Sequence, residues 1–128
     1  MGALILDANV LIALLDTADA HHDQAVDDVE AADQAGQALT APAGAYSEAL
    51  VAFARAGRLA DARTAIAAMG ITVAELSAES AERAAELRAR HATLRLGDAV
   101  VLATAQSLSA QLLTYDKRLG KLAAKGPA

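Results

Sequence analysis

The sequence contains no cysteine, which excludes several kinds of protein at once. Without thiols the chain cannot be a disulfide scaffold, hold zinc through thiolates or use a cysteine nucleophile. No apolar run reaches the roughly 18 residues that a membrane-spanning helix needs. The first residues also lack the basic segment of a signal peptide, and they place Asp7 where its apolar segment would lie. We therefore expect a cytoplasmic protein without a membrane partner.

Lys and Arg are absent from residues 1–54, which carry nine acids. Residues 55–128 hold all eleven Lys and Arg and seven acids, so the two parts carry formal charges of −9 and +4. The net charge of −5 argues against a nucleic-acid partner, but the second part is basic enough to meet one. Seven acids lie within residues 16–33. They form either a solvated helix face or a docking surface for a basic partner. The late cations are either scattered charges or a phosphate-binding patch: Arg88, Arg90, Arg95, Lys117, Arg118, Lys121 and Lys125.

No repeat and no long linker divides the chain, which predicts one domain over residues 1–128 with a frayed tail at about 124–128. Alanine, the best helix former, accounts for 36 residues. Short apolar runs predict strands covered on both faces at 3–6, 37–41, 71–74 and 111–114. The segments between them predict helices over 8–15, 21–35, 42–55, 59–69, 78–91 and 98–109. This alternation indicates an α/β fold with a mostly parallel sheet and helices on both of its faces.

Four acids stand among apolar neighbours, where an ionised carboxylate is costly unless it is paired or bound to a metal: Asp7, Glu48, Asp98 and Asp116. Asp7 and Asp116 end predicted strands, Asp98 opens a predicted helix, and Glu48 lies one to two turns inside another. Because ligands bind beyond the carboxyl ends of parallel strands, we expect all four at one crevice. Mg²⁺ or Mn²⁺, which prefer oxygen ligands, would offset their mutual repulsion.

Each acid also has a simpler interpretation. Asp7 and Asp98 could only cap helices, Asp116 could only form a turn, and Glu48 could lie in solvent at a helix edge. A non-catalytic α/β binding or signalling module would carry such acids. A receiver domain would have paired acids after its first strand, where Asp7 stands alone, and an aspartyl phosphatase would have a second Asp at the position of Asn9.

Four segments resemble the PIN-domain ribonucleases, and within them the VapC-type toxins of bacterial toxin–antitoxin modules: Leu4–Ile12, Ser47–Leu50, Leu94–Ala99 and Leu113–Asp116. Their order and spacing, and the total length, agree with that family over nearly the whole chain. The resemblance implies a three-layer α/β/α sandwich and endonucleolytic RNA cleavage that depends on Mg²⁺ or Mn²⁺. It also implies an antitoxin that covers the site, and a homodimer.

The same resemblance assigns the catalytic and metal-site acids to Asp7, Glu48, Asp98 and Asp116, with Asn9 and Thr114 as supporting polar residues. Asp7 and Asp98 would hold the ion with help from Asp116, and Glu48 would complete the site or orient the attacking water. Leu96 and Gly97 stand where some members carry further acids, so one ion is better supported than two. The cations expected to contact RNA are Arg88, Arg90, Arg95, Lys117 and Arg118. We expect His21 and His22 to be exposed polar residues, and residues 16–33 to receive a basic antitoxin segment.

Overall fold

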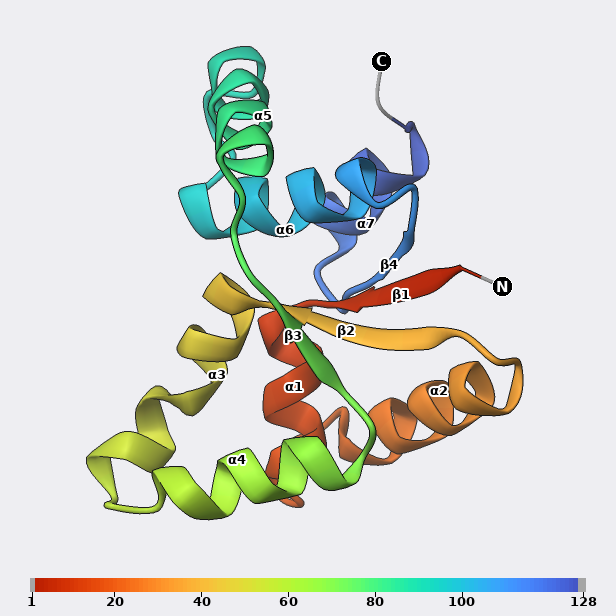
Figure 1. The fold of residues 1–128 in the computed structure, drawn as a ribbon, viewed down its shortest axis with the longest axis vertical. Coiled ribbons are helices and arrows are strands. Elements are labelled where there is room, and N and C mark those ends of the chain that lie inside the picture. Colours follow the sequence, from red (N-terminus) through yellow and green to blue (C-terminus); the bar gives the residue numbers. More distant parts are fainter. Residues whose placement is uncertain (1, 127–128) are drawn as a thin grey trace.

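The computed structural model describes residues 2–126, and within them a four-stranded sheet lies among seven helices (Figure 1). The strands are β1 (Ala3–Leu6), β2 (Ala38–Pro42), β3 (Thr72–Ala74) and β4 (Gln111–Leu113). The helices are α1 (Ala8–Leu15), α2 (His22–Gln34), α3 (Ala43–Arg55), α4 (Leu59–Ala68), α5 (Ala78–Arg90), α6 (Leu96–Ser107) and α7 (Lys117–Ala124). All strand pairings are parallel, in the order β3-β2-β1-β4.

Helices cover both faces of this sheet and form the predicted three layers. Helices α5, α6 and α7 lie on one side, whereas α1, α2 and α4 lie on the other (Figure 1). Helix α6 contributes Val101 to the core cluster that includes β1 and α1, and Leu102 to the cluster shared with α5 and α7. This double packing explains why α6 is apolar nearly all round. None of the helices described in residues 2–126 combines the length and the hydropathy of a membrane-spanning segment.

The central strands are buried as predicted, but the edge strands are not. Ile5 and Leu6 of β1 have no exposed surface, and Ala41 of β2 is equally buried. Strands β3 and β4 each have a single neighbour, so their residues are partly open, and Val73 is 40% exposed. The expectation of strands covered on both faces is therefore wrong at the two edges of the sheet.

Several helix boundaries differ from the sequence prediction by one or two residues, and one helix was not predicted. Ser77 caps α5 as expected, accepting a hydrogen bond from the Ser80 backbone N–H at 3.1 Å. Helix α6 begins at Leu96, two residues earlier than expected, and α3 begins after Pro42, which ends β2. Helix α7 had no prediction at all. Its last residue, Ala124, begins the expected frayed tail, and residues 127–128 of that tail lie outside the described residues.

Candidate functional site

Asp7 lies at the carboxyl end of β1, where it is only 5% exposed. Its backbone N–H donates to the Leu113 carbonyl at 3.1 Å, which continues the pairing of β1 with β4 up to this residue. Its side chain caps α1, because Oδ1 accepts a hydrogen bond from the Ala8 N–H at 2.8 Å. The interpretation of Asp7 as a helix cap is thus correct, and the second carboxylate oxygen is left for other partners.

The hydroxyl of Thr114 gathers the polar groups around Asp7. It donates a hydrogen bond to Asp7 Oδ2 at 2.8 Å, and it accepts one from Asn9 Nδ2 and one from the Asp116 backbone N–H, each at 3.1 Å. Asn9 Nδ2 also donates to Asp7 Oδ2 at 3.2 Å, while Asn9 Oδ1 accepts from the Tyr115 N–H at 3.1 Å. Asn9 and Thr114 therefore hold the Asp7 carboxylate and the β4–α7 loop in one network.

Asp116 begins the helix that the sequence prediction missed. Its Oδ1 accepts hydrogen bonds from the backbone N–H groups of Arg118 at 2.9 Å and Leu119 at 3.2 Å. Asp116 is thus an N-cap rather than only a turn residue. Within residues 2–126 its Oδ2 makes no hydrogen bond, so this oxygen is available to a ligand.

Asp98 does not cap α6, and that alternative is wrong. Arg95 holds the N-cap position, and Asp98 lies in the first turn of the helix. The Asp98 side chain is 18% exposed, and its Oδ2 lies 3.3 Å from Arg95 Nε. A carboxylate in the first turn of a helix is favoured by the helix dipole, and here it also has a cationic partner.

Glu48 lies on the exposed face of α3, in agreement with its interpretation as a solvated residue. Its carboxylate nevertheless lies close to the start of α6. A Cβ atom at position 97, where the chain has glycine, would be 3.7 Å from Glu48 Oε1. The residue before Asp98 is thus in contact distance of Glu48. Glu48 therefore stands at the open edge of the acid group rather than within it.

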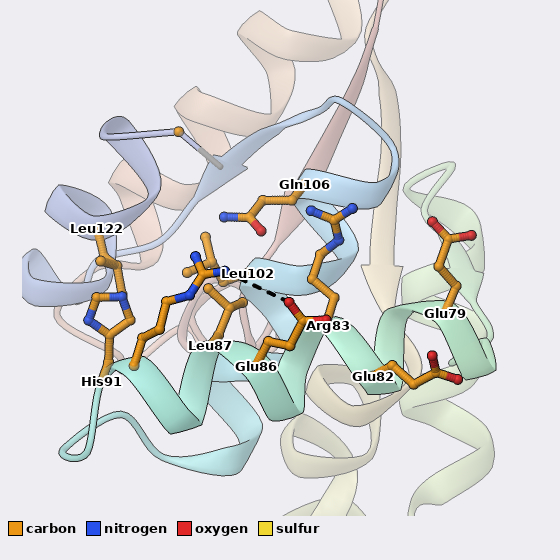
Figure 2. A pocket seen from close by; sticks show the side chains of 11 residues that line it. Glu79, Glu82, Arg83, Glu86, Leu87, His91, Leu102, Gln106 and Leu122 are labelled. Atoms are coloured by element: carbon orange, nitrogen blue, oxygen red, sulfur yellow. Dashed lines mark ion pairs between the residues drawn. The ribbon is translucent and has the colours of Figure 1, made fainter. Parts of the chain in front are cut away.

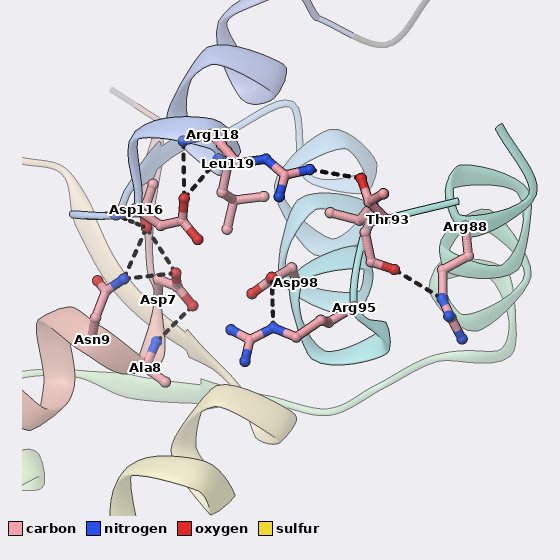
Figure 3. Close-up of polar contacts among 12 residues, drawn as sticks. Asp7, Ala8, Asn9, Arg88, Thr93, Arg95, Asp98, Asp116, Arg118 and Leu119 are labelled. Atoms are coloured by element: carbon pink, nitrogen blue, oxygen red, sulfur yellow. Dashed lines mark hydrogen bonds and ion pairs between the residues drawn. The ribbon is translucent and has the colours of Figure 1, made fainter. Parts of the chain in front are cut away.

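The carboxylates of Asp7, Asp98 and Asp116 face one common space (Figure 3). Burial raises the pKa of Asp7, and the charges of Asp98 and Asp116 raise it further, against the hydrogen bonds from Thr114 and Ala8. The pKa of Arg95 is raised in turn, mainly by the charge of Asp98 and also by Glu48 and Asp116. The charges of Asp98 and Asp116 thus act on both Asp7 and Arg95, which places these acids and this guanidinium in one small region.

The carboxylate oxygens of these acids suit a hard divalent cation, but their present arrangement does not surround a single metal position. Every candidate ligand is a carboxylate oxygen, which Mg²⁺ and Mn²⁺ prefer. Among the described residues, no three His, Asp or Glu side chains already surround a single point closely enough to hold a metal. Asp98 Oδ2 is paired with Arg95, and only Oδ2 of Asp116 lies outside the capping hydrogen bonds, so an ion bound to Asp98 Oδ2 would have to displace Arg95.

The predicted RNA-contacting cations do not form one patch. Arg95 and Arg118 line a cavity of about 480 Å³ that begins at Asp98 and Asp116. Arg88 instead donates to the Leu94 carbonyl at 3.0 Å, and Arg90 lies 3.8 Å from Glu86 on the same helix. Lys117 is exposed and does not line this cavity.

A second cavity, of about 250 Å³, lies between α5, α6 and the end of α7 (Figure 2). Three glutamates and two arginines line it, so its charge is mixed, and none of the four site acids reaches it. Arg83 Nε is buried there without a hydrogen-bond partner among residues 2–126. This cavity is therefore separate from the acid group.

Tyr115, which the sequence analysis did not single out, ties the site to α2. Its hydroxyl donates to Asp28 Oδ2 at 2.9 Å, and its ring stacks on His21 with centroids 4.8 Å apart. His21 is exposed as predicted, but His22 is half-buried, with Nδ1 2.7 Å from the Ala13 carbonyl oxygen, so that prediction is wrong. The sequence signal that could have identified Tyr115 is its position between two predicted site residues, Thr114 and Asp116.

Three comparisons with known proteins bear on this site. No curated protein matches the chain significantly. Among solved structures, the fold is similar to Mycobacterium tuberculosis VapC20, described as a sarcin-ricin loop cleaving toxin, with a TM-score of 0.73 and 18% identity over 94% of this chain and 95% of that one. It is similar to a toxin–antitoxin complex from Klebsiella pneumoniae, with a TM-score of 0.71 and 25% identity over 91% and 88%.

A third similar structure is VapBC2 from Rickettsia felis, which is bound to a DNA fragment from its promoter. Its TM-score is 0.76, with 12% identity over 93% of this chain and 92% of that one. The PIN-domain family model matches residues 4–125, a range that contains all four acids and both supporting residues. The chain therefore belongs to the PIN-domain family.

Proposed function

We propose that this protein is a metal-dependent endoribonuclease and the toxin of a toxin–antitoxin pair. One observation carries the proposal: Asp7, Asp98 and Asp116 face a common space at the carboxyl end of a parallel sheet, in a PIN-domain chain. The similarity to VapC20, described as a sarcin-ricin loop cleaving toxin, supports RNA as the substrate. The similarity to two toxin–antitoxin complexes supports the role as a toxin.

The residues that would hold a metal ion are Asp7, Asp98 and Asp116, with Glu48 at the edge. A bound Mg²⁺ or Mn²⁺ would supply charge neutralisation for the phosphodiester and a water of lowered pKa. Thr114 and Asn9 keep Asp7 Oδ2 directed at the common space through their hydrogen bonds. Glu48, which is exposed, stands where it can orient the attacking water.

Arg95 supplies the positive charge at this site. Its guanidinium reaches Asp98 from an exposed position, and it is 79% exposed itself. Exposed ion pairs contribute little stability, so the pair can open at small cost. Arg95 can then contact a phosphate oxygen of the RNA, which a planar guanidinium binds well.

The partner that we propose for inhibition is a basic antitoxin segment docking on α2. Asp23 and Asp27 of this helix are exposed, whereas Asp28 is committed to Tyr115. Reversing Asp23 and Asp27 to Lys should weaken binding of the cognate antitoxin, and unchanged affinity would remove α2 from the interface.

We also propose a homodimer, for which sedimentation gives a direct test.

The decisive experiment is RNA cleavage with and without Mn²⁺ by the wild type, Asp7→Asn and Asp98→Asn. Both variants should stay folded and lose activity, because each removes a ligand charge from the common space. Asp33→Asn is the matched control, since this acid is exposed on α2 and away from the site. Wild-type cleavage by both site variants would refute the proposal.

The second candidate is a non-catalytic binding module whose acids only cap helices. It is favoured by the capping hydrogen bonds that Asp7 and Asp116 make. A melting temperature that does not respond to Mg²⁺ or Mn²⁺, together with no cleavage, would support this candidate. A metal-dependent shift that is lost in Asp98→Asn would exclude it, because Asp98 caps nothing.

A further inference from the structure

The cavity beside Asp98 and Asp116 has a wall that the proposed cleavage chemistry does not use. It lies between residues 91–95, which join α5 to α6, and the helix α7 (Figure 3). Its volume of about 480 Å³ lies within the range of about 300–1,000 Å³ that is typical of small-molecule sites. The two acids occupy one end, so the cavity is an extension of the common space.

Cations and apolar side chains share the rest of the lining. Helix α7 contributes Arg118 and Lys121, and its C-cap residue, Lys125, joins them; these cations follow one another at intervals of three and four residues and therefore lie on one side of the helix. Leu94, Leu119 and Leu122 form apolar parts of the wall. Such a lining suits a ligand that combines negative charge with a flat or apolar body.

The lysines of this wall have no acidic partner among the described residues. Within residues 2–126, neither Lys121 nor Lys125 forms an ion pair. The dipole of α7 favours cations at this end of the helix, whereas two like charges four residues apart repel each other, so a bound anion would relieve a repulsion. Their presence on a face that lines a cavity therefore points to a negatively charged ligand.

Arg118 crosses the cavity and keeps most of its donors available. One guanidinium nitrogen, Nη2, donates to Thr93 Oγ1 at 2.6 Å and so links α7 to the 91–95 segment. A guanidinium carries five N–H donors, and this contact uses one of them. The remaining donors can bind phosphate oxygens.

We propose that this cavity is a nucleotide subsite, which binds the nucleotide next to the cleaved bond of a single-stranded RNA. The inference rests on the proposed ribonuclease function, since the phosphate to be cleaved would lie at the acid end. The backbone then continues toward Lys121 and Lys125, and the base lies against Leu94 and Leu122. A free phosphate ion would not need the apolar wall, and an acidic peptide would gain nothing from the neighbouring metal-site acids.

The test measures binding separately from cleavage. A fluorescein-labelled single-stranded RNA of ten nucleotides is titrated in EDTA, where metal-dependent cleavage cannot occur, and anisotropy is followed from 25 to 200 mM salt. The site variant is Lys121→Gln with Lys125→Gln. Its control is Arg55→Gln with Arg63→Gln, which removes the same charge from exposed positions on α3 and α4.

We expect the site variant to bind about 5- to 25-fold more weakly near 0.1 M salt, because each phosphate contact releases counterions. The slope of the logarithm of the binding constant against the logarithm of the salt concentration should become less steep by roughly 0.7 for each lysine that is lost. The control should bind as the wild type does. With Mn²⁺ present, the site variant should raise KM and leave kcat unchanged, whereas a general structural defect would lower kcat as well.

Equal affinity of the two double variants for RNA would overturn the subsite. So would displacement of the RNA by poly-glutamate at equal charge concentration, which would identify a site for acidic peptides. The single variants Lys121→Gln and Lys125→Gln should each bind the RNA about fivefold more weakly. They decide the question if the double variant does not fold. Wild-type protein that binds RNA through this wall but never cleaves it would refute the proposed function and leave the subsite in place.

Discussion

The hydroxyl of Thr114 donates a hydrogen bond to Asp7 Oδ2 at 2.8 Å, across 107 positions of the sequence. Parallel pairing of β1 with β4 makes this contact possible, because it brings the carboxyl ends of both strands to one edge of the sheet. The same hydroxyl accepts hydrogen bonds from Asn9 and from the Asp116 N–H. One side chain thus orients one proposed metal ligand and the backbone of another.

Replacing Thr114 by Val keeps the shape of the side chain and removes all three hydrogen bonds. Mutation of residues that orient metal ligands typically lowers metal affinity or activity by about 10- to 100-fold. We therefore expect a loss of that size in the cleavage rate and in Mn²⁺ affinity. Stability should fall by about 1–3 kcal/mol, since polar partners are left unpaired. Steady-state cleavage, calorimetric Mn²⁺ titration and urea unfolding measure the three effects.

Thr114→Ser is the matched control, because it keeps the hydroxyl and loses only a methyl group. It should retain most of the activity and Mn²⁺ affinity. If the Ser and Val variants behave alike, the hydroxyl and its hydrogen bonds do not account for the effect at this position.

The sequence sufficed to place Asp7 and Asp116 because each directly follows a short apolar run. Parallel topology then requires that both residues lie at the same edge of the sheet. The helix α7 was missed because Gly120 interrupts it, and glycine is a poor helix former. Its start signal is Asp116, whose capping role becomes visible only when Lys117–Ala124 is a helix.

Side-chain pairing was the part that sequence patterns could not supply. The pattern of α6 suggested a start at Asp98, yet Arg95 takes the N-cap position through its extended backbone, with no side-chain cap. The contact of Tyr115 with Asp28 spans 87 positions and no local rule indicates it. The cavity wall of α7 likewise depends on how that helix faces the 91–95 segment.

The metal-free protein should gain stability when Asp7 is changed to Asn. Burial, aided by the charges of Asp98 and Asp116, raises the pKa of Asp7 above its unfolded-state value near 3.9. Between these two pKa values the folded state binds more protons than the unfolded state, so the free energy of unfolding falls as pH rises. Above the folded pKa the ionised Asp7 destabilises the fold by its full amount, and Asn removes that effect.

Urea unfolding of wild type and Asp7→Asn in EDTA, from pH 4 to pH 7, measures this difference. The advantage of the variant should be largest at pH 7 and shrink as pH falls toward the unfolded-state pKa. An advantage that grows on acidification would contradict the raised pKa of Asp7. Adding Mn²⁺ at pH 7 should stabilise the wild type more than the variant, because the variant lacks a ligand charge.

Arg95 should compete with the metal ion for Asp98. Its Nε lies 3.3 Å from Asp98 Oδ2, and a cation bound to that oxygen must displace it. Arg95→Gln is therefore expected to raise Mn²⁺ affinity by roughly two- to fivefold, the scale of an exposed ion pair. Cleavage at saturating Mn²⁺ should nevertheless fall, since the phosphate loses its guanidinium contact. Calorimetric titration with Mn²⁺ separates the two effects, and a lower Mn²⁺ affinity in the variant would contradict the competition.

Tyr115→Phe should lower the free energy of unfolding by about 1 kcal/mol, because the ring is kept and only the hydrogen bond to Asp28 is lost. Burial and the contact with Asp28 raise the pKa of the Tyr115 hydroxyl above its usual range, so this proton is present throughout the neutral pH range. Urea unfolding of Tyr115→Phe, Asp28→Asn and the double variant gives the coupling between the two residues. Strict additivity would mean that the 2.9 Å contact contributes nothing. A positive coupling, with reduced cleavage in both single variants, would show that α2 helps to position the loop carrying Thr114 and Asp116.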